Sequence, residues 1–165
     1  MAFPNDLLEQ ARHLANREPK RPKQASLRRA VSTAYYALFH LLSIETAKNW
    51  KRRAERPMVA RMLDHSQMSR VCTSKRDELN GQFRTGRTTG RELAVLKHLH
   101  LIADTFVLML QHRHTADYDS SVKWTRTDAL EKIESVEAAF KSWHEIRGEH
   151  AAQNFLVTLL LRERR

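Results

Sequence analysis

Residues that interrupt helices are scarce in this chain. Its 165 residues include only 4 glycines and 4 prolines, and two long stretches, 23–56 and 91–147, contain neither. Sheets rich in tight turns depend on these two residue types, so their scarcity disfavours a β-rich fold and excludes collagen-like and low-complexity classes. Because 41% of the residues are hydrophobic, the chain has enough apolar side chains for a core. We therefore expect a globular protein made of long helices.

Apolar residues recur every three or four positions along most of the chain, which is the spacing of an amphipathic helix. From Leu101 to Leu110 the sequence is apolar nearly all round, as expected for a buried central helix. Four principal helices joined by short polar links favour an antiparallel bundle. The predicted fold class is all-α, an antiparallel bundle of four to six helices forming a single domain over 1–165. The expected helices cover 5–17, 26–47, 58–74, 91–115, 128–146 and 150–163.

Capping residues and breakers indicate where these helices begin and end. Asn5 or Asp6 is expected to cap the first helix. Thr127 or Asp128 is expected to cap the helix that ends near Ile146, and Asp128 and Glu131 have the spacing of a capping box. Segment 75–90 contains three of the four glycines and is otherwise mainly polar and basic, so it is predicted to be a flexible surface loop.

The C-terminal extension, 149–165, leaves alternatives open. Its apolar run Phe155–Leu161 fits a helix that completes the core, or an exposed face for a second copy or a partner. The same run has high β propensity, so a strand is an alternative to the helix.

The net charge of +10 is unevenly distributed. Residues 1–100 contain 20 basic and 9 acidic side chains, a net charge of +11, whereas residues 101–165 contain 9 and 10, a net charge of −1. Such an excess favours a polyanionic partner or an anionic surface but says nothing about the fold.

Cysteine usage, the first ten residues and the short apolar runs lead us to expect a cytoplasmic location. The single cysteine, Cys72, cannot form an internal disulfide, and we expect it to be a small apolar core residue. The first ten residues lack the basic region and apolar run of a signal peptide. The apolar runs are also shorter than the roughly 20 residues of a membrane span.

Polar and titratable residues follow the apolar run of the central helix, in segment 111–121. Arg113 and Asp117 are spaced i,i+4 and can pair on one helix face, while His114 and Tyr118 stand beside them. Such groups either line a cleft between helices or simply close the helix end with an ion pair. Without other information, the residue types in this segment favour the ion pair at the helix end over the cleft.

Two motifs resemble the HEPN superfamily. The segment LRRAVSTAYYALFHLL, 27–42, resembles the second helix of HEPN-domain proteins, and RHTADYD, 113–119, resembles the Arg-x-x-Ala-Asp-Tyr pattern of one branch. The segment DHSQM, 64–68, lies where members of that branch have a histidine at the start of a third helix. The similarity covers roughly residues 25–145.

This resemblance implies a helical bundle that forms a homodimer. Many HEPN proteins are metal-independent ribonucleases of toxin–antitoxin or defence systems, paired with a nucleotidyltransferase antitoxin. Their sites combine arginine and histidine in an Arg-x(4–6)-His motif. Other members bind nucleic acid, nucleotides or a protein partner without cleaving RNA. The resemblance implies no cofactor.

The chain departs from the ribonuclease motif at one position. Four residues separate Arg113 from Tyr118, which stands where the motif would have its histidine. His114 or His65 would therefore have to supply the imidazole. Arg113 is the natural phosphate ligand because its planar guanidinium matches phosphate oxygens. Asp117 and Tyr118 complete the candidate catalytic residues. Whether the protein cleaves RNA or only binds it stays open at this point.

Basic residues gather in three segments, 17–29, 48–56 and 75–90. Such clusters suit sequence-independent contacts with a phosphate backbone, although a solvated helix face is the commoner role of any single cluster. Histidine pairs such as His98 and His100 are spaced i,i+2 and point to different faces, so no metal site is expected. The candidate nucleic-acid-binding residues are Lys20, Arg21, Lys23, Arg28, Arg29, Lys51, Arg52, Arg53, Arg84 and Arg87.

Overall fold

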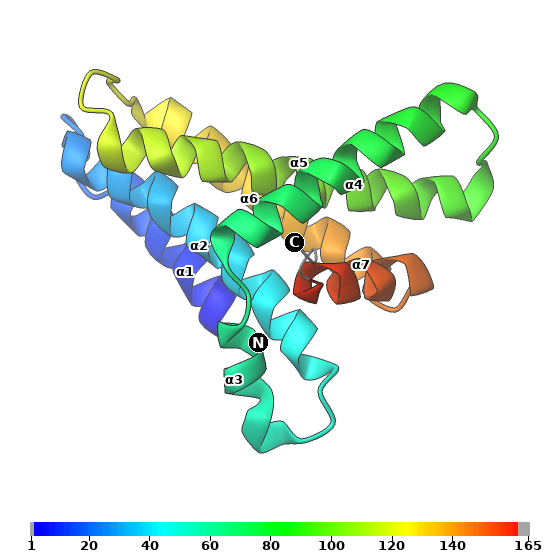
Figure 1. Cartoon of the computed structure of the whole chain (residues 1–165). Helices are drawn as coiled ribbons and strands as arrows, with labels where there is room; N and C mark the ends of the chain where they lie inside the picture. Colours follow the sequence, from blue (N-terminus) through cyan, green and yellow to red (C-terminus); the bar gives the residue numbers. More distant parts are fainter. Residues whose placement is uncertain (1, 162–165) are drawn as a thin grey trace. The chain divides into compact units, whose positions relative to one another are not determined.

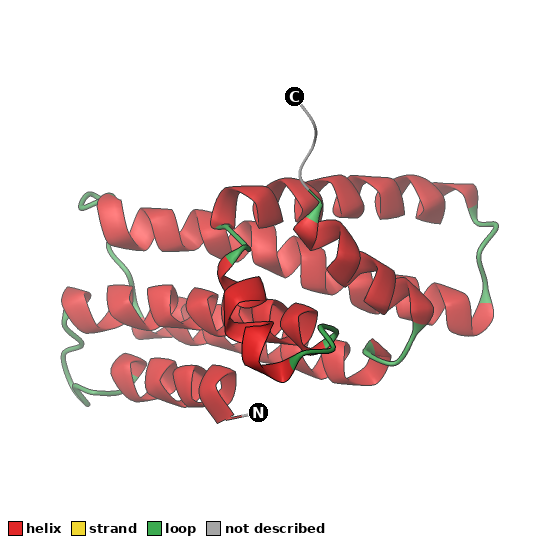
Figure 2. Cartoon of the chain, turned by 60° about the horizontal axis from the view of Figure 1, so that its bottom comes forward, coloured by secondary structure: helices red, strands yellow, loops and turns green. Residues whose placement is uncertain are grey.

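A computed structural model describes residues 2–161 of the chain, and within them every regular element is helical. The all-α bundle is therefore confirmed, and the strand alternative for Phe155–Leu161 is wrong (Figure 2). The described part of the chain contains seven α-helices, one more than the upper end of the expected range, because the helix expected over 58–74 is divided into two. The elements are α1 (Ala2–Ala15), α2 (Gln24–Lys48), the 3-10 helix η1 (Arg53–Glu55), α3 (Arg56–Arg61), α4 (His65–Thr85), α5 (Gly90–Tyr118), α6 (Arg126–Ile146) and α7 (His150–Leu160).

The described chain divides into two compact units. The first contains the residues up to His40 together with Thr105–Phe140, and the second contains Leu41–Asp104 together with the residues from Lys141 onward. The boundaries between the units fall inside α2, α5 and α6, so each of these three long helices contributes residues to both.

The first unit is built around the buried ring of Tyr35. This side chain has no exposed surface and contacts Phe106 of α5, with ring centroids 5.6 Å apart. An ion pair adds to this core: Arg12 of α1 donates from Nε and Nη2 to the two carboxylate oxygens of Glu137 on α6, at 2.7 and 2.6 Å. Helix α1 is thereby held by both its buried apolar face and one two-pronged ionic contact.

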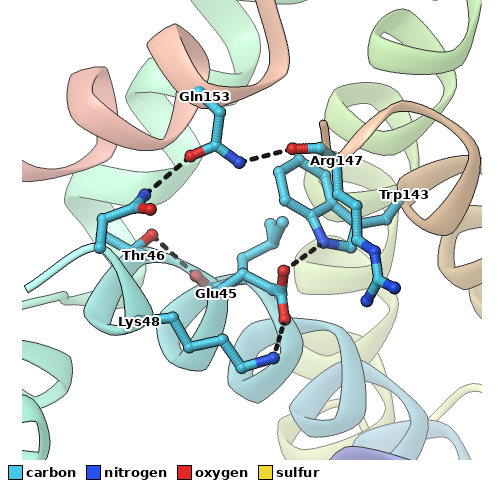
Figure 3. A network of polar contacts seen from close by, with 8 residues as sticks. Glu45, Thr46, Lys48, Trp143, Arg147 and Gln153 are labelled. Carbon is cyan, nitrogen blue, oxygen red and sulfur yellow. Dashed lines mark hydrogen bonds and ion pairs between the residues drawn. The ribbon is translucent and has the colours of Figure 1, made fainter. Parts of the chain in front are cut away.

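The second unit contains a buried carboxylate, Glu45, on α2 (Figure 3). Its side chain is only 7% exposed and accepts hydrogen bonds from the indole nitrogen of Trp143 at 3.0 Å and from Nζ of Lys48 at 2.6 Å. Gln153 of α7 accepts a bond from Asn49 at 2.9 Å in the same region. A buried carboxylate is tolerated only when it is paired in this way, so these contacts fix the C-terminal part of α2 against α6.

The starts of two helices differ from the predicted ones. Helix α1 begins at Ala2, before Asn5 and Asp6, because Pro4 fits the first turn, where no intrahelical N–H bond is needed. Before α6, Thr125 and Asp128 form the capping box: Asp128 N–H donates to Thr125 Oγ1 at 3.0 Å, and Thr125 N–H donates to Asp128 Oδ2 at 2.9 Å. Asp128 is therefore the inner member of the box, and the helix starts before Thr127.

The prediction of a flexible loop over 75–90 is wrong for most of its length. Helix α4 continues to Thr85, and only 86–89 separate it from α5. Met68, Cys72 and Leu79 are buried on one face of α4, and this burial outweighs the cost of the helical Gly81. Gly86 ends the helix with φ of 62°, a left-handed conformation that favours glycine.

The predicted helix over 58–74 is also interrupted. Helix α3 ends at Arg61, and Asp64 begins α4 by accepting a hydrogen bond from Gln67 N–H at 2.8 Å. The first N–H groups of a helix have no partner within the helix, and the Asp64 carboxylate accepts a hydrogen bond from one of them. Asp64 therefore favours the start of a new helix over continuation of α3.

Within the C-terminal extension, the apolar run of α7 mainly completes a core. Phe155, Leu156 and Leu159 are each 1% exposed, as the core alternative predicts, whereas Val157 is 51% exposed. Among the described residues, only α5 has the length and apolar composition of a membrane-crossing helix, although its apolar run was expected to be too short, and 56% of its most apolar 18 residues is buried within the structure.

Gly81 lies within α4 and Gly86 is its C-terminal cap, so substitutions at these two glycines test whether the helix extends to Thr85. Gly81→Ala is expected to raise the free energy of unfolding by about 0.5–1 kcal/mol, since Gly81 is helical and an added methyl group meets nothing within 4 Å. Gly86→Ala is expected to lower it by about 1–2 kcal/mol because of the positive φ. Urea unfolding of both variants measures these changes. Two neutral substitutions would contradict the helical assignment, since a flexible loop tolerates both.

Candidate nucleic-acid interface

Arg113 and Asp117 form the predicted i,i+4 ion pair near the C-terminal end of α5. Nε of Arg113 donates to Oδ2 of Asp117 at 3.0 Å, and the two side chains are 15% and 23% exposed. Ser32 of α2 donates its hydroxyl to the same oxygen at 3.3 Å. Because the pair engages Nε, the two Nη nitrogens of Arg113 lie outside it.

Aromatic rings of α2 orient this guanidinium further. The central carbon of the Arg113 guanidinium lies 5.4 Å from the centre of the Tyr36 ring and 6.0 Å from that of Tyr35. Cation–π contacts at such distances stabilise the side chain without using its N–H groups. Tyr36 and Ser32 therefore help to build the site, and neither was among the candidate site residues predicted from the sequence. Their i,i+4 spacing puts both on one face of α2, but the spacing does not say that this face meets α5.

Two further candidate residues lie on the exposed side of the same helix end. Tyr118 is 75% exposed, and its ring contacts that of His114 edge to face, with centroids 6.2 Å apart. His114 is also exposed to solvent. The structure thus gathers Arg113, His114, Asp117 and Tyr118 on the last turns of one helix. His65 is the first residue of α4 and belongs to the second unit.

Two loops of the first unit meet at this end of α5 (Figure 1). Arg126 donates to the carbonyl oxygens of Ala15 and Pro19, both at 3.1 Å, and Gln24 exchanges two hydrogen bonds with the backbone of Trp124, at 2.8 and 2.9 Å. These bonds join the α1–α2 loop to the α5–α6 loop. The predicted phosphate-binding residues Lys20, Arg21, Lys23 and Arg29 are exposed on this loop and on the first turns of α2, and Arg17 is a further exposed cation of the loop.

Arg28 has a different role from the neighbouring cations. Its guanidinium donates to the carbonyl oxygens of Ala116 at 2.8 Å, Asp119 at 2.9 Å and Val122 at 2.6 Å. These carbonyls belong to the last turn of α5 and the loop after it, where the helix leaves acceptors unpaired. The positive charge also complements the negative end of the helix dipole. We therefore remove Arg28 from the proposed phosphate-binding residues.

The other predicted cations belong to the second unit. Lys51, Arg52 and Arg53 are exposed between α2 and α3. Arg84 and Arg87 are exposed at the turn between α4 and α5, beside a small cavity of about 320 Å³ lined in part by Phe83, Thr88 and Lys97. These five side chains are available to solvent, and together they supply positive charge to this unit.

Burial and local hydrogen bonds shift the pKa of several groups. Burial of the His112 ring, assisted by the charge of Lys132, lowers its pKa, and burial also lowers the pKa of His40. Burial raises the pKa of the Cys72 thiol, which therefore stays protonated and unreactive at neutral pH. The hydroxyl and backbone N–H of Ser121 lower the pKa of Asp119, which stays ionised. Within residues 2–161, no group of three or more His, Cys, Asp or Glu side chains is arranged to hold a metal ion.

No protein-family model, curated protein or solved structure matches this chain.

The contrast between Arg28 and Arg29 tests the structural role of the first. Arg28→Ala is expected to lower the free energy of unfolding by about 2 kcal/mol because three carbonyl oxygens are deprived of a charged donor. Arg29→Ala removes an exposed charge and is expected to change it by less than about 0.5 kcal/mol. Thermal and urea unfolding measure both values. Equal effects of the two substitutions would show that the carbonyl contacts do not stabilise the fold.

Proposed function

We propose that this protein binds RNA through phosphate contacts at the end of the first unit. One observation carries the proposal: four exposed cations, Lys20, Arg21, Lys23 and Arg29, lie at the same end as Arg113 with its stacked guanidinium. Sequence-independent binding to a nucleic acid depends mainly on such contacts between basic side chains and phosphates. The resemblance of 27–42 and 113–119 to HEPN proteins supports RNA as the nucleic acid.

Metal-independent cleavage of the bound RNA is a second candidate function. It is favoured by the position of Arg113, which is oriented by Tyr36 and Asp117 and keeps its Nη nitrogens outside the ion pair. In the reaction, O2′ of a ribose attacks the adjacent phosphorus, His114 accepts the 2′ proton, and the bond from phosphorus to O5′ breaks. Water protonates the leaving O5′, giving a 2′,3′-cyclic phosphate. Arg113 stabilises the additional negative charge on the phosphate oxygens.

The remaining proposals concern partners and rest on the resemblance. A homodimer would bring two copies of Arg113 into one groove, and a toxin–antitoxin or defence system would pair the protein with a nucleotidyltransferase in the cytoplasm. The 75% exposure of Tyr118 supports one feature of that pairing, since the phenol is accessible to a modifying enzyme. A non-catalytic nucleotide-binding or partner-binding protein is the alternative to cleavage.

RNA binding by the purified protein is expected to weaken as salt rises. Replacing Lys20, Arg21, Lys23 and Arg29 by Gln should weaken binding and reduce the slope of log affinity against log salt, by up to about 0.7 for each phosphate of a single strand that is no longer neutralised. Fluorescence anisotropy with labelled RNA measures both quantities. The matched control replaces four exposed cations of the second unit, Arg61, Arg70, Lys97 and Lys141, with Gln. Equal weakening in both quadruple variants would show that net charge, rather than this surface, determines binding.

Cleavage is tested separately with total RNA and transfer RNA in the presence of EDTA, which inactivates contaminating metal-dependent nucleases. Arg113→Ala is expected to lower the rate by about 100-fold or more, as removal of one charge-stabilising donor does in other enzymes. His114→Gln, at an exposed position with little effect on folding, should lower it by about 100-fold. Wild-type protein that binds RNA and leaves it intact would exclude cleavage and favour the non-catalytic alternative.

A further inference from the structure

Trp50 is the exposed tryptophan of the described chain. Trp143 has no exposed surface and Trp124 is 7% exposed, whereas Trp50 is 48% exposed. It lies in the loop between α2 and η1, residues 49–52, within the second unit. An indole ring in water forgoes the large stabilisation that burial of a tryptophan provides, so its place on the surface calls for an explanation.

The exposed ring is nevertheless held in position. The indole nitrogen donates to Oε2 of Glu55 at 2.7 Å, and the backbone N–H of Trp50 donates to the Ala47 carbonyl at 3.0 Å. The Trp50 carbonyl accepts a bond from Nε of Arg56 at 2.9 Å. These contacts hold the indole nitrogen and the backbone of the residue, while about half of the side chain's surface stays exposed to solvent.

Basic residues flank Trp50 in the sequence. Segment 48–56 contains five basic side chains and one acidic side chain, Glu55, which is already bonded to Trp50 and to Arg52 at 3.2 Å. Arg52 is 79% exposed, and Lys51 and Arg53 are exposed on either side of it. An oriented aromatic ring beside several exposed cations is the arrangement with which proteins bind single-stranded nucleic acids, since bases stack on the ring while the cations contact phosphates.

We infer that Trp50 is a stacking platform for an unpaired base of single-stranded RNA, with Lys51, Arg52 and Arg53 contacting its phosphates. This inference rests on the proposed function and adds to it a preference for unpaired RNA. The bases of a duplex are already stacked on one another and cannot use the ring. An anionic membrane surface would also attract this segment, and Met58 and Met62 are 63% and 59% exposed nearby in sequence. The fixed orientation of the indole favours stacking, because insertion into a bilayer does not require it.

The test compares binding of labelled oligouridine and of a blunt RNA duplex. Trp50→Ala is expected to weaken oligouridine binding roughly 5- to 150-fold, the range typical of removing one base–aromatic stack, and to leave duplex binding within about 2-fold. Trp50→Phe keeps an aromatic ring and should retain most of the affinity. Val157→Ala, another exposed apolar position of the second unit, is the matched control and should change neither value.

Intrinsic fluorescence gives a second measurement on the wild-type protein. Because the other two tryptophans are buried, collisional quenching by acrylamide acts mainly on Trp50, and oligouridine should protect it. Oligouridine that binds the wild type and Trp50→Ala equally would overturn the inference while leaving the proposed RNA binding intact. Wild-type protein that binds no RNA would overturn both. Vesicles containing phosphatidylglycerol that alone protect Trp50 and shift its emission to the blue would assign the segment to a membrane surface instead.

Discussion

The contact between Arg28 and three backbone carbonyls joins α2 to the C-terminal end of α5, the longest helix among residues 2–161. The guanidinium of Arg28 binds the oxygens of Ala116, Asp119 and Val122, at a helix end that has no further intrahelical donors for its last carbonyls. The charge of one side chain on α2 therefore holds the last turn of α5 and the loop that follows. Arg113 and Asp117 lie on that last part of the helix, so their position depends on this contact.

The buried faces of the helices were predictable because apolar residues recur at helical spacing along the chain. Leu27 to Ala47 and Leu93 to Leu110 follow helical spacing over many turns, and each additional apolar residue on the face reinforces the same result. Segment 75–90 shows where this reasoning fails. The expectation there depended on the number of glycines, but Leu79 continues the buried face of α4, and tertiary burial outweighs the preference of one glycine.

Contacts of the candidate site within α5 were predictable from the sequence, but its contacts between α2 and α5 were not. Spacing within α5 correctly predicted the Arg113–Asp117 pair, because i,i+4 neighbours must lie on one face. Nothing in the sequence tells which ring of α2 lies beneath the guanidinium, since this depends on the relative rotation of the two helices. For the same reason Arg28 and Arg29 are indistinguishable in sequence, although one closes a helix and the other is exposed to solvent.

The inert thiol of Cys72 has a consequence for the dynamics of the protein. It is fully buried on the inner face of α4, and it is the only cysteine in the chain. A thiol reagent can therefore modify it only after α4 has separated from its neighbours, so the rate of modification reports the free energy of that opening. Cys72 is thus a native probe for the local opening of α4, and this opening can be measured without introducing a label.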